Sequence, residues 1–135
     1  MLSEKDYYFT IEITPEGYQR PYINYALEEN QFLRQLIYFQ NLRKSEGVKN
    51  AILIINKVID AIAAEEEIYD RDVPTDVICY ALVKKEITII VDCTAGNQDY
   101  KINTLVFKKM LDDWLLFLLK YENNQIPNLI YNFIQ

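Results

Sequence analysis

The sequence predicts an α+β fold, in which a mostly antiparallel sheet carries about three helices on one face. Segments near the N-terminus and in the middle of the chain alternate apolar and polar residues with a period of two, as half-buried strands do. Other segments repeat apolar residues at helical spacing. The order of strand, helices, meander and final helix is typical of α+β folds rather than of alternating β–α units. With 135 residues, half of them hydrophobic, we expect a single globular domain over residues 1–135.

The first element is a strand over Tyr7–Thr14, where Tyr7, Phe9 and Ile11 alternate with polar neighbours. The sequence Thr14-Pro15-Glu16-Gly17 ends this strand, because proline and glycine interrupt regular structure. The region Tyr18–Leu27 is ambiguous, since it fits either a returning strand or the start of a helix.

Two helices are expected next. The first runs from about Glu28 to Glu46, and Gly47 follows as its stop, because glycine enters the left-handed cap at little cost. The second runs from Val48 to about Glu67. Its apolar residues fall on one side: Val48, Ile52, Ile55, Ile59 and Ile62.

The C-terminal half predicts a loop, a meander and a last helix. Asp70–Asp76 contains a proline and is expected to be a loop. The strands of the meander are Val77–Val83, Ile87–Thr94 and Tyr100–Asn103, with Lys84-Lys85 at the first turn. Asn103 or Thr104 can cap the last helix, which has a broad apolar stripe centred on Trp114. We expect the tail Ile126–Gln135 to pack back on the domain.

The chain offers few groups suited to catalysis, and we do not expect an enzyme. It contains no histidine, the side chain that titrates near neutral pH. Asp70-x-Asp72 resembles the start of a calcium loop, but Pro74 and Thr75 stand where a ligand and a glycine are needed. Asp112 and Asp113 are adjacent on a helix and therefore point in different directions. We expect no cofactor and no metal.

The two cysteines, Cys79 and Cys93, lack the spacing of a zinc site. They could meet across a hairpin, but we expect two buried free thiols. The formal charge of −6 argues against binding nucleic acid or an anionic membrane, which both need a basic face. The N-terminus has no apolar stretch typical of a signal peptide, and the run Trp114–Leu119 is far shorter than the ~20 residues that span a bilayer. A cytoplasmic location is therefore expected.

An acidic run between residues 65 and 76 is the most conspicuous chemical feature, with Arg71 as its single basic residue. Carboxylates at the C-terminal end of a helix oppose the helix dipole, so this run is placed where it does not favour stability. We therefore predict that it binds a basic protein partner, with a tyrosine as aromatic anchor. The predicted partner-binding residues are Glu65, Glu66, Glu67, Tyr69, Asp70, Asp72 and Asp76. The alternative is a solvated helix end that keeps the domain soluble.

The C-terminal half also resembles a known class of proteins. The hairpin Asp76–Thr94, the strand Tyr100–Asn103 and the Trp-centred helix Asn103–Leu119 are together similar to the small cytoplasmic immunity proteins of bacterial polymorphic and contact-dependent toxin systems. This resemblance implies a stoichiometric inhibitor that occludes a cognate toxin, often a basic nuclease, without chemistry of its own.

Two other functions remain open. The first is a regulatory or small-ligand-binding domain with a pocket between sheet and helices. The second is a small hydrolase or metal-dependent enzyme using Asp70, Asp72 or Asp92. The oligomeric state is also left open.

Overall fold

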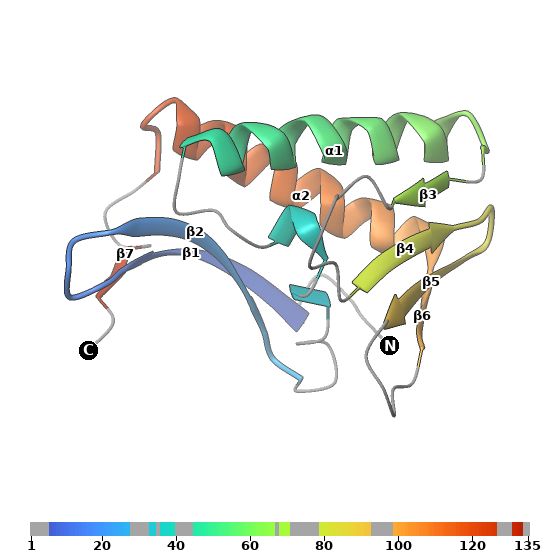
Figure 1. Ribbon diagram of the computed structural model, residues 1–135, viewed down its shortest axis with the longest axis horizontal. Helices are drawn as coiled ribbons and strands as arrows, with labels where there is room; N and C mark the ends of the chain where they lie inside the picture. Colours follow the sequence, from blue (N-terminus) through green and yellow to red (C-terminus); the bar gives the residue numbers. More distant parts are fainter. Residues whose placement is uncertain are drawn as a thin grey trace.

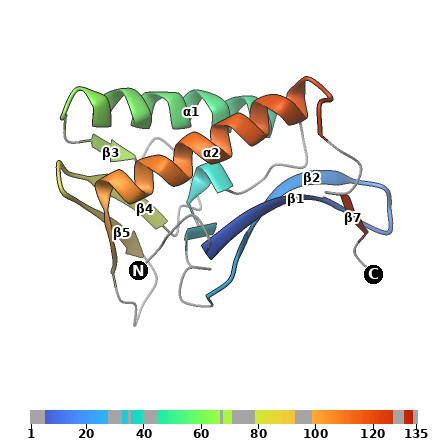
Figure 2. The same ribbon diagram turned by 180° about the vertical axis from the view of Figure 1, so that it is seen from behind.

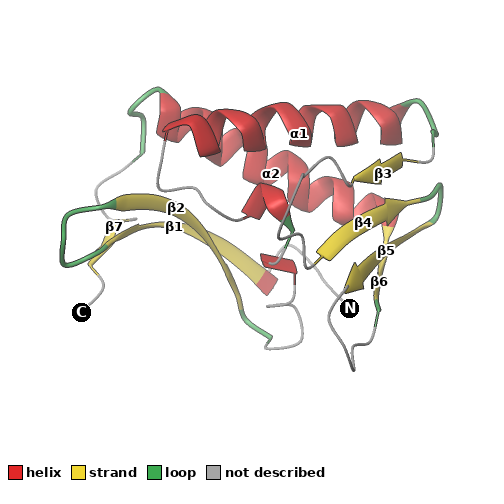
Figure 3. Cartoon of the chain, in the orientation of Figure 1, coloured by secondary structure: helices red, strands yellow, loops and turns green. Residues whose placement is uncertain are grey.

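The computed structural model describes residues 6–27, 33–34, 36–39, 45–66, 68–70, 79–92, 99–126 and 131–133. Helices α1 (Ser45–Ala63) and α2 (Thr104–Glu122) run antiparallel and lie on one side of two separate sheets (Figure 1). The α+β class with mostly antiparallel strands is confirmed, whereas the expected single sheet is replaced by two (Figure 3). Neither of these helices has the length and apolar composition needed to cross a membrane, as judged over the part of the chain described.

The N-terminal sheet has the strand order β2-β1-β7. Strand β1 (Tyr7–Ile13) pairs antiparallel with β2 (Gln19–Tyr25), so the ambiguous region returns as a strand. Gly17 lies in the connecting turn with a φ of 89°, a conformation that favours glycine. Strand β7 (Tyr131–Phe133) pairs in parallel with the end of β1, as expected of a tail that packs back.

The meander sheet has the order β3-β4-β5-β6, all antiparallel. Strands β4 (Cys79–Val83) and β5 (Ile87–Asp92) form the predicted hairpin around Lys84-Lys85, and β6 (Tyr100–Asn103) is the predicted third strand. Strand β3 (Ile68–Asp70) was not expected and adds a fourth strand beside β4.

The expectation of three helices is wrong for the described residues. Where the first helix was expected, they contain the short 3₁₀ turn η3 (Ile37–Phe39), and Gly47 lies in the first turn of α1 instead of ending a helix. Leu33, Leu36 and Tyr38 are all fully buried. Side chains buried on several sides do not fit the single apolar face of a surface helix, so this segment packs as compact turns within the core.

Helix α2 is the centre of the core. It contacts β2 of the N-terminal sheet as well as β5 and β6 of the meander sheet, and so joins the two. Trp114 is fully buried, and its Nε1 donates a hydrogen bond to the carbonyl of Tyr38 at 3.0 Å. The rings of Phe9, Phe39 and Phe117 lie with their centroids 5.3 to 6.0 Å from that of Trp114. This aromatic cluster joins three elements that are distant in sequence.

Candidate functional site

Helix α1 ends in a left-handed residue that is not a glycine. Glu65 has a φ of 57°, its N–H donates to the carbonyl of Ile62 at 3.1 Å, and the N–H of Glu66 donates to that of Ala61 at 2.9 Å. These two bonds form a Schellman motif, in which Glu65 takes the position that glycine usually fills. A side chain with a Cβ costs roughly 1–2 kcal/mol in this conformation.

The charge at this end is also unfavourable. Glu65 and Glu66 are both exposed, and the last turn of α1 contains no basic residue. Each exposed carboxylate at the negative end of a helix costs about 0.3–1 kcal/mol at low salt. The end of α1 therefore carries two acidic side chains where stability alone favours glycine and lysine.

The turn between β4 and β5 lies beside this helix end and is held by the start of α2. The N–H of Thr104 donates to the carbonyl of Glu86 at 2.9 Å, and its hydroxyl donates to the carbonyl of Lys84 at 2.7 Å. The Thr104 hydroxyl has one hydrogen, so the bond of 2.9 Å between the two threonine Oγ1 atoms must be donated by Thr88. Both threonines are buried, so the turn has a defined position.

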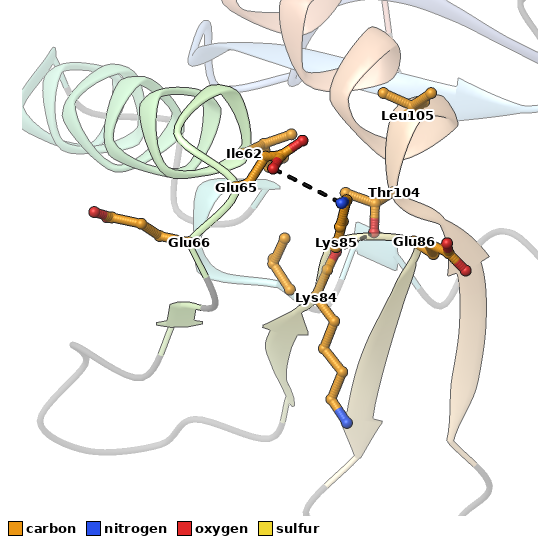
Figure 4. A pocket seen from close by; sticks show the side chains of 9 residues that line it. Ile62, Glu65, Glu66, Lys84, Lys85, Glu86, Thr104 and Leu105 are labelled. Carbon is orange, nitrogen blue, oxygen red and sulfur yellow. Dashed lines mark hydrogen bonds and ion pairs between the residues drawn. The ribbon is translucent and has the colours of Figure 1, made fainter.

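Lys85 bridges this turn to the helix end. Its Nζ lies 3.8 Å from Oε2 of Glu65, and the two side chains are 70% and 67% exposed. Figure 4 shows the carboxylate of Glu65 facing Lys85, whereas Glu66 and Lys84 point away. An exposed pair at this distance is worth well under about 1 kcal/mol, so it can exchange for a contact with another molecule.

A shallow hollow of about 250 Å³ separates the helix end from the turn (Figure 4). Its lining is mainly apolar, and charged side chains surround it. The lining residues are Ile62, Glu65, Glu66, Val83, Lys84, Lys85, Glu86, Thr104 and Leu105. Leu105 is 70% exposed at its edge. The arrangement suits contact with an apolar group that carries a charge nearby.

The structure places some of the predicted partner-binding residues at this site. Glu65 and Glu66 lie together on the hollow, and Tyr69 and Asp70 belong to β3, where they pair with Leu82 and Ala81. The other predicted members lie outside the described residues: Glu67, Asp72 and Asp76.

The sequence interpretation missed the basic residues and the apolar wall of the hollow. In the register of β3 and β4, Ile68 pairs with Val83, so the turn after Val83 lies next to the residues before Ile68. The hairpin turn at Lys84-Lys85 was predicted, but β3 was not. Without β3 there was no signal that Lys85 and the helix end would be neighbours.

A second polar cluster lies on α2, where it contacts β1. The hydroxyl of Tyr7 donates to Oδ2 of Asp113 at 2.6 Å, and Lys109 pairs with Oδ1 of the same carboxylate at 2.6 Å. Asp112 pairs separately with Lys108 at 2.9 Å, in agreement with the prediction that the two aspartates point apart. These pairs satisfy each other and join β1 to α2, so their role is structural.

Burial raises the pKa of the nearby Tyr25 hydroxyl well above its usual range, and Arg34 opposes this effect. The Tyr25 hydroxyl donates to the sulfur of Met110 at 3.6 Å. A phenol that stays protonated in this way is not suited to act as a base near neutral pH.

Within the described ranges, no three acidic, cysteine or histidine side chains come together as a metal ion would need. Asp92 is the last residue of β5, and Asp72 and Cys93 lie outside those ranges.

Comparisons with protein-family models, with curated proteins and with solved structures found no match to this chain.

Proposed function

We propose that this chain is a non-catalytic protein-binding protein that uses the end of α1 and the acidic segment after it to bind a basic protein. The observation that carries the proposal is Glu65, an exposed glutamate in a left-handed conformation that follows the negative end of a helix. Glu66 adds a second exposed carboxylate beside it. Each of these two side chains lowers the stability of the helix end, and a role in contacting a partner accounts for their presence there.

The specific function we propose is that of a cytoplasmic immunity protein. The acidic segment from Glu65 to Asp76 would occupy the cationic groove of a cognate toxin, such as a nuclease, where substrate phosphate binds. Tyr69 would serve as the aromatic anchor, and the hollow beside Leu105 would receive an apolar group of the partner. Inhibition would be stoichiometric, since occlusion needs no chemistry.

The experiment compares two double variants that each remove two negative charges. E65Q/E66Q neutralises the end of α1, and E16Q/E46Q neutralises two exposed glutamates elsewhere, in the β1–β2 turn and at the start of α1. The partner is isolated from native cells by pull-down with the wild-type chain, and association rates are measured as a function of salt.

We expect E65Q/E66Q to lower the association rate about tenfold at low salt and to weaken its salt dependence. The E16Q/E46Q variant should keep the wild-type rate within a factor of about two to three, because more distant charges are largely screened. Binding that does not depend on salt, or equal effects of the two double variants, would contradict the proposal.

The hollow favours a second candidate, a regulatory or small-ligand-binding domain. Its volume of about 250 Å³ is below the roughly 300–1,000 Å³ of typical ligand sites, which places this candidate second. A fragment screen followed by two-dimensional NMR distinguishes the two. Fragments that shift the amides of Val83, Thr104 and Leu105 at micromolar affinity would favour the ligand-binding domain.

A further inference from the structure

Two arginines stack on one tyrosine of β2, which is an edge strand of the N-terminal sheet in the described part of the chain. The Cζ atoms of Arg34 and Arg20 lie 4.3 and 4.9 Å from the ring centroid of Tyr22. Arg34 also lies 5.6 Å from the ring centroid of Tyr25, and its Nε donates to the carbonyl of Ile23 at 2.8 Å. These contacts hold the Arg34 guanidinium in one orientation.

The charges of these two arginines are poorly matched by the described residues. No described carboxylate forms an ion pair with Arg34, although the chain has 20 acidic and 14 basic residues. Arg20 reaches Glu12 at 3.5 Å, and its buried Nε has no hydrogen-bond partner in the described structure. A guanidinium fixed through its Nε presents its terminal nitrogens as a fork that fits a carboxylate.

The surrounding surface carries an exposed aromatic side chain beside half-buried polar ones. Both helices cover the opposite face of the N-terminal sheet (Figure 1 and, from behind, Figure 2). On the outer face Tyr8 is 60% exposed, and its cross-strand partner Asn24 is half-buried. Tyrosines supply contact area at a low cost in side-chain entropy.

The edge of β2 is poorly suited to pairing with an added strand, so we expect a partner to bind through side chains. The N–H of Thr14 donates to the carbonyl of Tyr18, and the N–H of Ala26 donates to that of Asp6. In the antiparallel register these bonds fix which residues of β2 bond to β1, and the backbone groups of Pro21 and Ile23 point away from β1. Pro21 has no N–H to donate, and the carbonyl of Ile23 is already occupied by Arg34.

We propose that this face binds an acidic peptide segment of a partner protein. Arg34 would bind one carboxylate through both terminal nitrogens, Arg20 would bind a second, and Tyr8 and Tyr22 would contact the peptide. Among the described residues this face has two guanidiniums and one carboxylate paired with them, that of Glu12, so it matches one or two isolated negative charges. A nucleic-acid strand needs a longer basic track and is repelled by the net charge of −6. This surface is separate from the acidic end of α1.

The test uses the full chain labelled with ¹⁵N, at low salt, with the capped peptide acetyl-hexaglutamate-amide as probe. Two-dimensional NMR follows the backbone amides of β2 and the Nε–Hε resonance of Arg34. Acetyl-hexaglutamine-amide is the matched uncharged probe, and a decathymidylate oligonucleotide tests for nucleic-acid binding.

We expect hexaglutamate, and not hexaglutamine, to shift the Arg34 Nε–Hε resonance and the amides of β2. R34Q should weaken the affinity at least about tenfold, and R34K should weaken it too, because lysine keeps the charge but lacks the fork and the stacking surface. K49Q removes one exposed positive charge on α1 and should leave the affinity unchanged. Far-UV circular dichroism checks that each variant folds, and the Arg34 resonance of the wild-type chain tests the site without any substitution.

Any one of four results would overturn the proposal. The first is an Arg34 resonance that does not move at millimolar hexaglutamate. The second is equal weakening by R34Q and K49Q, and the third is wild-type affinity in R34K. The fourth is tighter binding of the oligonucleotide than of the peptide at the same salt concentration.

Discussion

The two long helices end with the same backbone conformation and with different side-chain chemistry. At the end of α2, Asn124 has a φ of 55°, and the N–H groups of Asn124 and Gln125 donate to Tyr121 and Lys120 at 3.1 and 2.8 Å. At the end of α1, Glu65 has a φ of 57° and the equivalent two bonds are 3.1 and 2.9 Å. Both ends are Schellman motifs with a non-glycine residue in the left-handed position.

The two ends differ in whether their residues favour the stability of the helix. Among residue types, asparagine tolerates this left-handed conformation best after glycine. Lys120 lies in the last turn of α2, where the helix dipole favours a cation. The end of α1 has a glutamate in that position and no basic residue in its last turn. The end of α2 shows that this chain can end a helix with residues that favour stability. We therefore interpret the acidic end of α1 as less stable than it could be because its side chains serve binding.

The largest effect should come from breaking the link that places the β4–β5 turn beside the end of α1. Thr104→Val leaves the half-buried hydrogen bond to the carbonyl of Lys84 unmade and the buried hydroxyl of Thr88 without its partner. We expect the free energy of unfolding to fall by about 2 kcal/mol. Urea denaturation measures this change, and Thr104→Ser is the control, since it keeps the hydroxyl and should lose clearly less. Equal losses in the two variants would assign the effect to the methyl group.

The next effect tests whether asparagine matters at the end of α2. Asn124→Ala puts a residue with an ordinary Cβ in the left-handed position, and we expect a loss of about 1 kcal/mol in unfolding free energy. Asn124→Gly should change the stability by no more than about 0.5 kcal/mol, because glycine tolerates this conformation but gains freedom in the unfolded chain. Thermal unfolding by circular dichroism compares the two. If alanine is as stable as glycine, the left-handed position carries no strain.

The elements that the sequence predicted well have strong local signals. The bounds of β6 match the prediction. Asn103, one of the two residues expected as the cap, caps α2, and its Oδ1 accepts from the N–H groups of Leu105 and Val106 at 2.9 and 3.3 Å. Period-two alternation, a polar cap and an apolar stripe are all properties of neighbouring residues. The final helix and the hairpin were predicted for the same reason.

The features that the sequence did not reveal depend on long-range contacts. The division into two sheets and the existence of β3 follow from which strands pair, and Ile68 pairs with Val83 across the long connection between them. At the candidate site, the sequence itself showed the acidic run that contains Glu65 and Glu66. It did not predict the left-handed φ of Glu65, because glutamate gives no signal for that conformation.

A smaller effect of opposite sign is expected when the end of α1 is made to resemble the end of α2. Glu65→Asn places the better-tolerated residue in the left-handed position and removes one carboxylate from the negative end of the helix. We expect the free energy of unfolding to rise by about 0.5–1 kcal/mol, measured by urea denaturation. The same variant should bind the basic partner more weakly. A variant that is more stable and binds equally well would show that Glu65 is not kept for contact.

The smallest effect on stability is expected at Lys85, whose ion pair with Glu65 is long and exposed. Lys85→Gln should change the free energy of unfolding by less than about 0.5 kcal/mol, because screening and side-chain entropy cancel most of the attraction. Its effect on binding should be larger and favourable, since it removes a cation that competes with the basic partner for Glu65. We therefore expect faster association at low salt, whereas Lys49→Gln, on the exposed face of α1, should leave the rate close to that of the wild type. Slower association in Lys85→Gln would place Lys85 itself in the interface, and the acidic end of α1 would then not act alone.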